Sequence, residues 1–87
     1  MAPMRSAIEI SMYPLSGEYL PLIQAFIDRL NTYPDLIVRT NSLSTQIWGD
    51  LAHTMDVVSR EIERSAGAAP QLVFVMKVLP GLMPPVA

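Results

Sequence analysis

The chain has 87 residues, of which 51% are hydrophobic and 16% are charged, and its formal net charge is −2. This length favours one domain, residues 1–87, and a chain with no cysteine and one histidine can hold neither a disulfide framework nor a Cys/His zinc site. The slightly acidic balance also lacks the basic surface that nucleic acids require, so we expect no nucleic-acid partner.

The first half of the chain predicts a strand, a helix and a second strand. Residues 7–13 alternate between apolar and polar side chains and stop at Pro14, which is typical of a strand with one apolar face. Apolar residues over 22–30 recur at helical spacing, so a helix should start near 18–20, with Pro21 in its first turn, and end around 31–33. A second alternating strand follows over 36–41.

The second half predicts a strand over 44–49, a helix from Asp50 to about Ser65, and a last strand over 72–79. Asp50 is the expected N-cap of this helix, and Gly67 is expected to close it. The order is β-α-β-β-α-β. With right-handed crossovers, it predicts a ferredoxin-like α+β sandwich in which a four-stranded antiparallel sheet carries two helices on one face.

The period of two divides the strand residues between two faces of this sheet. The residues expected to meet the helices are Ile8, Ile10, Met12, Leu36, Val38, Leu72, Phe74, Met76 and Val78. The residues expected on the other face are Ala7, Glu9, Ser11, Tyr13, Ile37, Arg39, Asn41, Ser44, Gln46, Trp48, Val73, Val75 and Lys77. Apolar surface on a small domain without covalent or metal staples indicates association. We therefore expect a homodimer or homotetramer whose stacked sheets bury Val73, Val75 and Trp48.

Polar side chains concentrate over residues 39–50, around the link between the second and third strands. Their hydroxyl and amide groups can bond the edge of a flat heteroaromatic ring, and an indole can stack on such a ring. The alternative, which composition alone favours, is a hairpin rich in turn-forming residues. Ser11 and Tyr13 lie on the central first strand and need partners from a ligand or an opposed chain. Glu9 and Lys77 should pair across adjacent strands.

The sequence predicts neither catalysis nor a membrane segment. It contains no G-x-S-x-G, P-loop, H-E-x-x-H or G-x-G-x-x-G motif, and His53 is expected to be an exposed helix residue rather than a base. We therefore expect no enzymatic activity, cofactor or metal. Residues 1–6 lack the apolar run of a signal peptide, and the longest wholly apolar stretch, Leu72–Met76, is far shorter than a membrane span. The expectation is a soluble cytoplasmic protein.

Three segments, residues 8–15, 41–50 and 73–81, resemble the thiamine/hydroxymethylpyrimidine-binding family typified by YkoF. The likeness runs from the first strand to the last. It implies a ferredoxin-like fold, no catalysis, and binding of thiamine or its hydroxymethylpyrimidine precursor in vitamin salvage or transport. Typical members carry two such modules in tandem or assemble single ones, so a dimer of this one-module chain could rebuild the tandem arrangement.

The resemblance assigns ligand binding to Ser11, Tyr13, Asn41, Ser44, Thr45, Gln46, Trp48 and Asp50. This assignment is chemically compatible, because an aminopyrimidine offers two ring nitrogens and an exocyclic amine to hydroxyls and amides. The thiazolium cation of thiamine would suit Asp50 or Glu9 and the ring faces of Trp48 or Tyr13. Two interpretations stay open: a binder of thiamine or its precursor, and a structural oligomerisation module with no small-molecule ligand.

Overall fold

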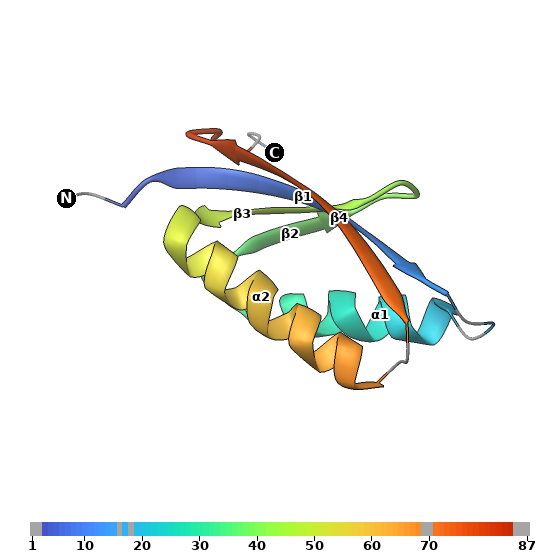
Figure 1. The fold of residues 1–87 in the computed structure, drawn as a ribbon. Helices are drawn as coiled ribbons and strands as arrows, with labels where there is room; N and C mark the ends of the chain where they lie inside the picture. The colour runs from blue at the N-terminus through green and yellow to red at the C-terminus, as the bar shows by residue number, and fades with distance from the viewer. Residues whose placement is uncertain (1–2, 16, 18, 69–70, 85–87) are drawn as a thin grey trace.

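The computed structural model describes residues 3–15, 17, 19–68 and 71–84 (Figure 1). In chain order the elements are β1 (Arg5–Pro14), α1 (Tyr19–Leu30), β2 (Ile37–Thr40), β3 (Thr45–Asp50), α2 (Leu51–Ala68) and β4 (Leu72–Pro80). The strands form one antiparallel sheet in the order β2-β3-β1-β4, and Figure 1 shows both helices on one side of it. The predicted ferredoxin-like α+β fold is confirmed. Within the described ranges, no helix is long and apolar enough to cross a membrane.

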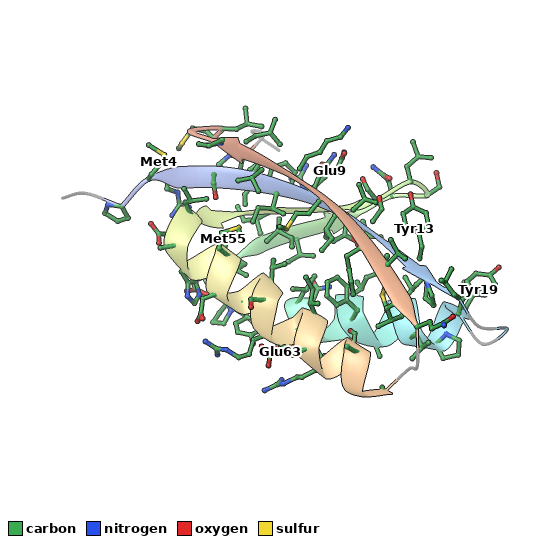
Figure 2. The ribbon with its side chains drawn as sticks, viewed as in Figure 1. Met4, Glu9, Tyr13, Tyr19, Met55 and Glu63 are labelled. Carbon is green, nitrogen blue, oxygen red and sulfur yellow. The ribbon has the colours of Figure 1, made fainter. Side chains whose placement is uncertain are left out.

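The strand register confirms that the sheet has two distinct faces. Ile8 of β1 lies opposite Ile47 of β3, whereas the next residue, Glu9, lies opposite both Gln46 and Lys77. Because side chains alternate along a strand, this register places Glu9, Gln46 and Lys77 on the face away from the helices. The expected cross-strand pair is present, with Lys77 Nζ 3.6 Å from Glu9 Oε1. Figure 2 shows Glu9 and Tyr13 projecting from this outer face.

The hydrophobic core fills the space between the sheet and the helices. Its buried members are Ile8, Ile10, Phe26, Leu30, Leu36, Ile47, Val57 and Val58. Met12, Val38 and Phe74 pack at its border, and Leu72 is half-buried. The expectation that Met76 and Val78 also meet the helices is wrong, because both side chains are exposed. They lie in the C-terminal half of the edge strand β4, which extends away from both helices (Figure 1).

Helix α2 begins where predicted but ends later. Asp50 Oδ2 accepts a hydrogen bond from the backbone N–H of His53 at 3.2 Å, so Asp50 is the N-cap. The helix then continues through Gly67 to Ala68, and the prediction that Gly67 closes it is wrong. A glycine that ends a helix usually adopts a positive φ, and among the described residues only Gly81, after β4, does so. His53 is half exposed, and its Nε2 lies 2.8 Å from Asp35 Oδ2.

A buried carboxylate that the sequence did not single out joins the two helices. The Glu61 side chain of α2 is 0% exposed, and it accepts hydrogen bonds from Arg29 Nε at 2.8 Å and from the Tyr33 hydroxyl at 2.9 Å. Arg29 Nη2 also donates to Ser65 Oγ at 2.7 Å, and Arg64 Nη1 lies 3.3 Å from Glu61 Oε2. The hydrogen bond to Glu61, together with burial, raises the pKa of Tyr33 above its ordinary value. These contacts hold α1 against α2.

Candidate ligand-binding site

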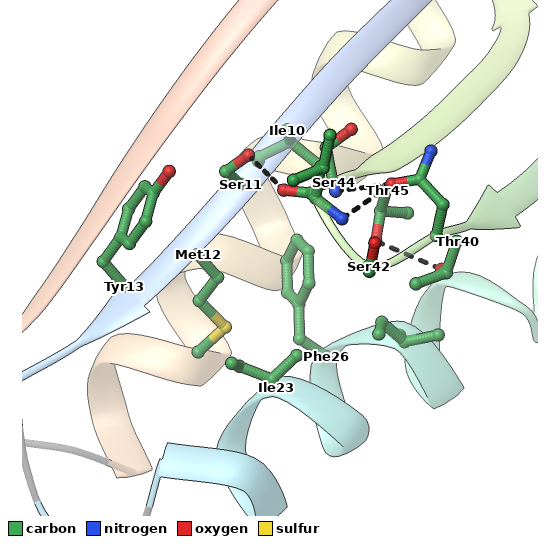
Figure 3. A pocket seen from close by; sticks show the side chains of 13 residues that line it. Ile10, Ser11, Met12, Tyr13, Ile23, Phe26, Thr40, Ser42, Ser44 and Thr45 are labelled. Atoms are coloured by element: carbon green, nitrogen blue, oxygen red, sulfur yellow. Dashed lines mark hydrogen bonds between the residues drawn. The ribbon is translucent and has the colours of Figure 1, made fainter.

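A cavity of about 210 Å³ lies where β1 continues past the end of β3 (Figure 3). The last residue pair between these strands is Ile10 with Thr45, but β1 runs on to Pro14 with β4 as its only neighbour. Beyond Ile10, the edge of β1 that faces β3 therefore has no strand beside it. The link between β2 and β3 crosses this gap. We call this space the hairpin cavity.

The hairpin cavity has an apolar side and a polar side. Figure 3 shows Ile23 and Phe26 reaching into it from α1, below Ile10 and Met12 of β1. The apolar side consists of Ile10, Met12, Ile23, Phe26 and Ile27, and the remaining lining residues are Ser11, Tyr13, Thr40, Asn41, Ser42, Leu43, Ser44 and Thr45. None of these residues carries a formal charge at neutral pH. The space thus presents an apolar surface to a ring and neutral hydrogen-bonding groups to its edge.

The hairpin that borders the cavity is shaped by Asn41. The side-chain oxygen Oδ1 of Asn41 accepts hydrogen bonds from the backbone N–H groups of Leu43 at 2.8 Å and Ser44 at 2.9 Å. The backbone N–H of Asn41 donates to the Ser44 carbonyl at 3.0 Å. The hydroxyl oxygens of Thr40 and Thr45 lie 3.1 Å apart across the two strands. Part of the polar cluster is therefore turn-forming, as the simpler interpretation of the sequence expected.

Ser11 ties this hairpin to β1. Its Oγ donates to the Leu43 carbonyl at 3.2 Å, so its partner comes from its own chain. The expectation that a ligand or an opposed chain must supply that partner is therefore wrong for Ser11. Within the part of the chain that the structure describes, the Asn41 amide nitrogen and the hydroxyls of Ser42 and Ser44 make no hydrogen bond to protein. These three groups remain available to a ligand.

Five of the predicted ligand-binding residues meet at the hairpin cavity, namely Ser11, Tyr13, Asn41, Ser44 and Thr45. Gln46 and Trp48 instead line a cavity of about 280 Å³ on the outer face of the sheet, together with Ala7, Ile8, Glu9, Lys77, Leu79 and Leu82. We call it the outer-face cavity. Asp50 lines neither of these two cavities. It caps α2 at the far end of β3, about 16 Å along the strand from Thr45.

Trp48 differs from the expectation in a second respect. It lies on the outer face, opposite Ala7 and Ile37, but is only 6% exposed in the single chain. Leu79 and Leu82 line the same cavity, so residues of its own chain surround the indole. The burial of Trp48 therefore needs no second sheet. Val73 and Val75 are exposed on that face, as expected.

Sequence reasoning missed the side of the cavity that α1 supplies. Ile23, Phe26 and Ile27 follow the same helical spacing as core residues, and Phe26 does also belong to the core. No signal in the sequence distinguishes an apolar residue that lines a cavity from one that only fills the core. The position of the cavity depends on where β3 ends beside β1, which is a property of the assembled sheet.

Comparisons with known proteins identify the fold. No family model and no curated protein matches the chain. A Thermotoga maritima protein provisionally assigned to thiamine biosynthesis or salvage is 14% identical with a TM-score of 0.79, over 86% of this chain and 82% of that one. A Streptococcus pneumoniae protein is 18% identical with a TM-score of 0.80, over 86% and 84%. A hypothetical protein of Methanocaldococcus jannascii is 22% identical with a TM-score of 0.75, over 85% and 77%. At these identities the likeness shows a shared fold.

Proposed function

We propose that this protein is a non-enzymatic binder of thiamine or its hydroxymethylpyrimidine precursor, acting in vitamin salvage or transport in the cytoplasm, and that the hairpin cavity is its binding site. The main support is the arrangement of that cavity, in which apolar side chains face uncharged hydroxyl and amide groups. Small-molecule sites combine such surfaces, because the apolar part supplies affinity and a few polar groups fix orientation. The sequence resemblance and the provisional assignment of the Thermotoga protein support the ligand class.

The proposed mechanism is recognition alone. The pyrimidine ring lies against Phe26 and Ile23 on the helix side of β1 (Figure 3). The amide nitrogen of Asn41 donates to a ring nitrogen, and the free hydroxyl of Ser44 accepts from the exocyclic amine. Because Asn41 Oδ1 is already bonded to the hairpin backbone, the amide nitrogen is held in a fixed orientation before the ligand arrives.

Ser44→Ala is expected to lower ligand affinity by about 0.5–1.5 kcal/mol, the value of one neutral hydrogen bond. The Ser44 hydroxyl makes no hydrogen bond to the described residues, and the backbone hydrogen bonds of Ser44 do not involve its side chain, so the hairpin should keep its shape. Isothermal titration calorimetry with thiamine and with hydroxymethylpyrimidine measures the effect.

Gln46→Ala is the matched control for Ser44→Ala, because Gln46 lines the outer-face cavity. The affinity of the Gln46→Ala variant for both compounds should equal that of the unaltered protein. Loss of binding in Gln46→Ala together with full binding in Ser44→Ala would move the site to the outer face. If neither compound gives heat at millimolar concentration, the chain does not bind this ligand class.

The second candidate function, structural oligomerisation, is supported by the apolar side chains exposed on the outer face of the sheet. These are Ile37, Val73, Val75 and Leu79. They form two groups, Ile37 with Leu79 and Val73 with Val75, on either side of the polar row that contains Glu9 and Lys77. Apolar side chains exposed on a small domain favour association. We propose that the chain forms a homodimer or homotetramer through this face, which would bury these side chains between two sheets.

Val75→Glu is expected to dissociate this assembly into folded monomers of 9.6 kDa. Val75 is 52% exposed in the single chain, so the substitution should not disturb the core, but it would place a charge between the stacked sheets. Sedimentation and circular dichroism at micromolar concentration measure size and fold. Leu20→Glu, on the exposed surface of α1, is the control and should stay assembled. A monomeric unaltered protein would contradict the proposal. An assembled protein whose melting temperature no ligand raises would favour the purely structural function.

A further inference from the structure

We propose that the hairpin cavity selects an uncharged, single-ring aminopyrimidine over ligands that carry a fixed charge. This inference rests on the proposed function and makes it more specific. Within that ligand class, the hydroxymethylpyrimidine precursor is uncharged, whereas thiamine carries a thiazolium cation and the phosphate esters of both carry negative charge. The sequence alone does not rank these compounds. The positions of the charged side chains do.

Among the residues that the structure describes, the carboxylates expected to suit a thiazolium, Glu9 and Asp50, lie outside the hairpin cavity. Glu9 lines the outer-face cavity, where its Oε1 is 3.6 Å from Lys77 Nζ. Asp50 caps α2 at the opposite end of β3 from Thr45. A cation bound beside the hairpin would therefore meet hydroxyls, an amide, aromatic rings, backbone groups and apolar groups, and no carboxylate from the described lining residues.

The basic side chains are also elsewhere, which disfavours a phosphorylated ligand. Arg39 precedes Thr40 in β2 but lies opposite Gln46, so it belongs to the outer face of the sheet. Arg29 is bonded to Glu61 and Ser65 of α2. Phosphate sites in proteins normally combine arginine or lysine with backbone N–H groups. Two backbone N–H groups of the hairpin are already bonded to the Asn41 side chain.

The cost of desolvation decides between the compounds. Transferring a fixed charge from water into a cavity without a counter-ion is unfavourable, whereas a neutral ring exchanges water for apolar contacts. A cation over an aromatic ring recovers part of that cost, but the half-exposed ring of Tyr13 projects from the outer face of the sheet, away from Phe26 (Figure 2). The Phe26 ring centroid lies 5.3 Å from that of Phe74 in a tilted arrangement, so part of the Phe26 ring is already covered by its own chain.

The size of the cavity agrees with the charge argument. Its volume of about 210 Å³ lies below the range of roughly 300–1,000 Å³ that is usual for sites enclosing drug-sized ligands. One substituted ring would fill such a space. The second ring of thiamine would extend beyond the cavity into water.

Calorimetry at mildly alkaline pH with three compounds tests the inference. Hydroxymethylpyrimidine is expected to bind at least about tenfold more tightly than thiamine or hydroxymethylpyrimidine phosphate. Equal or tighter binding of thiamine or of the phosphate would overturn the selectivity but leave the proposed function standing. No binding of any of the three would overturn both.

A charge introduced into the hairpin provides a second test. Asn41→Asp keeps an oxygen that can accept from the N–H groups of Leu43 and Ser44, so the turn should persist, and it adds a carboxylate beside the cavity. The ratio of thiamine affinity to hydroxymethylpyrimidine affinity should rise by about tenfold. Ala52→Glu, in the exposed first turn of α2, adds the same charge outside the cavity and should leave the ratio unchanged. An unchanged ratio in a folded Asn41→Asp protein would refute the charge explanation.

Discussion

Arg29→Ala is expected to lower the free energy of unfolding by about 3 kcal/mol, because it leaves a buried carboxylate without its main partner. The Glu61 side chain is fully buried, and Arg29 Nε donates to its Oε1 at 2.8 Å. In this variant Arg64 remains 3.3 Å from Glu61 Oε2 and still offers the carboxylate a positive charge, although it is largely exposed. The expected loss therefore lies at the lower end of the range for breaking a buried ion pair. Urea denaturation of the variant and the unaltered protein measures the difference. For a domain of this size, the loss is a large fraction of the total stability.

Two further variants test whether the expected loss comes from the buried ion pair. Arg60→Ala removes an exposed ion pair with Asp56 on the same helix and should cost at most about 0.5 kcal/mol. The double variant Arg29→Met/Glu61→Leu removes both charges and should recover most of the stability lost in Arg29→Ala. Apolar replacements avoid the free-energy cost of removing a pair of charges from water. If Arg29→Ala is as mild as Arg60→Ala, the network contributes little and packing alone holds the helices together.

The same network helps to position one side of the candidate site. Arg29 lies near the end of α1, and Ile23, Phe26 and Ile27 of this helix form one side of the hairpin cavity. Contacts with Glu61 and Ser65 fix α1 against α2 and therefore fix the distance of these side chains from β1. Hence the cavity depends on residues that do not touch it.

The fold was predictable because its determinants are local. Alternation along residues 7–13 marks β1 and both of its faces, and the observed register places Glu9 opposite Lys77 as that alternation requires. The acceptor at Asp50 marks the start of α2. The end of this helix was mispredicted, because a glycine tolerates both a helical and a left-handed backbone, and Gly67 continues the helix.

The candidate site was predictable only in part. Thr45 and Gln46 are adjacent in sequence, but neighbouring residues of a strand point to opposite faces, so the structure assigns them to different cavities. Glu61 looks like an ordinary helix-surface residue, because its partner Arg29 lies 32 positions away. Met76 and Val78 follow the same alternation as the strand residues that the helices cover. Their exposure depends on how far the helices extend under β4. Each of these outcomes depends on contacts between elements, which local periodicity does not contain.

Gly49→Ala is expected to destabilise the protein by about 2–3 kcal/mol, because β3 passes too close to the layer beneath it for a side chain. A methyl group on this residue would lie 2.6 Å from Leu36 Cδ2 and 2.7 Å from Thr54 Oγ1. Leu36 belongs to the core, and Thr54 is buried in the first turn of α2, so neither can retreat without displacing its neighbours. Ser6 Oγ also donates to the Gly49 carbonyl at 3.2 Å, which opposes a shift of the strand itself. Thermal and urea denaturation measure the loss.

Gly67→Ala is the matched control for Gly49→Ala, because Gly67 is helical and the added methyl group would have no described atom within 4 Å beyond the adjacent helix backbone and its chain neighbours. It should stabilise the protein by about 0.5–1 kcal/mol, since alanine favours the helix and loses less backbone freedom on folding. A second control, Leu36→Ala in the Gly49→Ala background, removes one of the two close contacts. The cost of the two substitutions together should therefore be smaller than the sum of their separate costs. If the two costs add fully, or if Gly49→Ala is as well tolerated as Gly67→Ala, then close packing is not the reason for a glycine in β3.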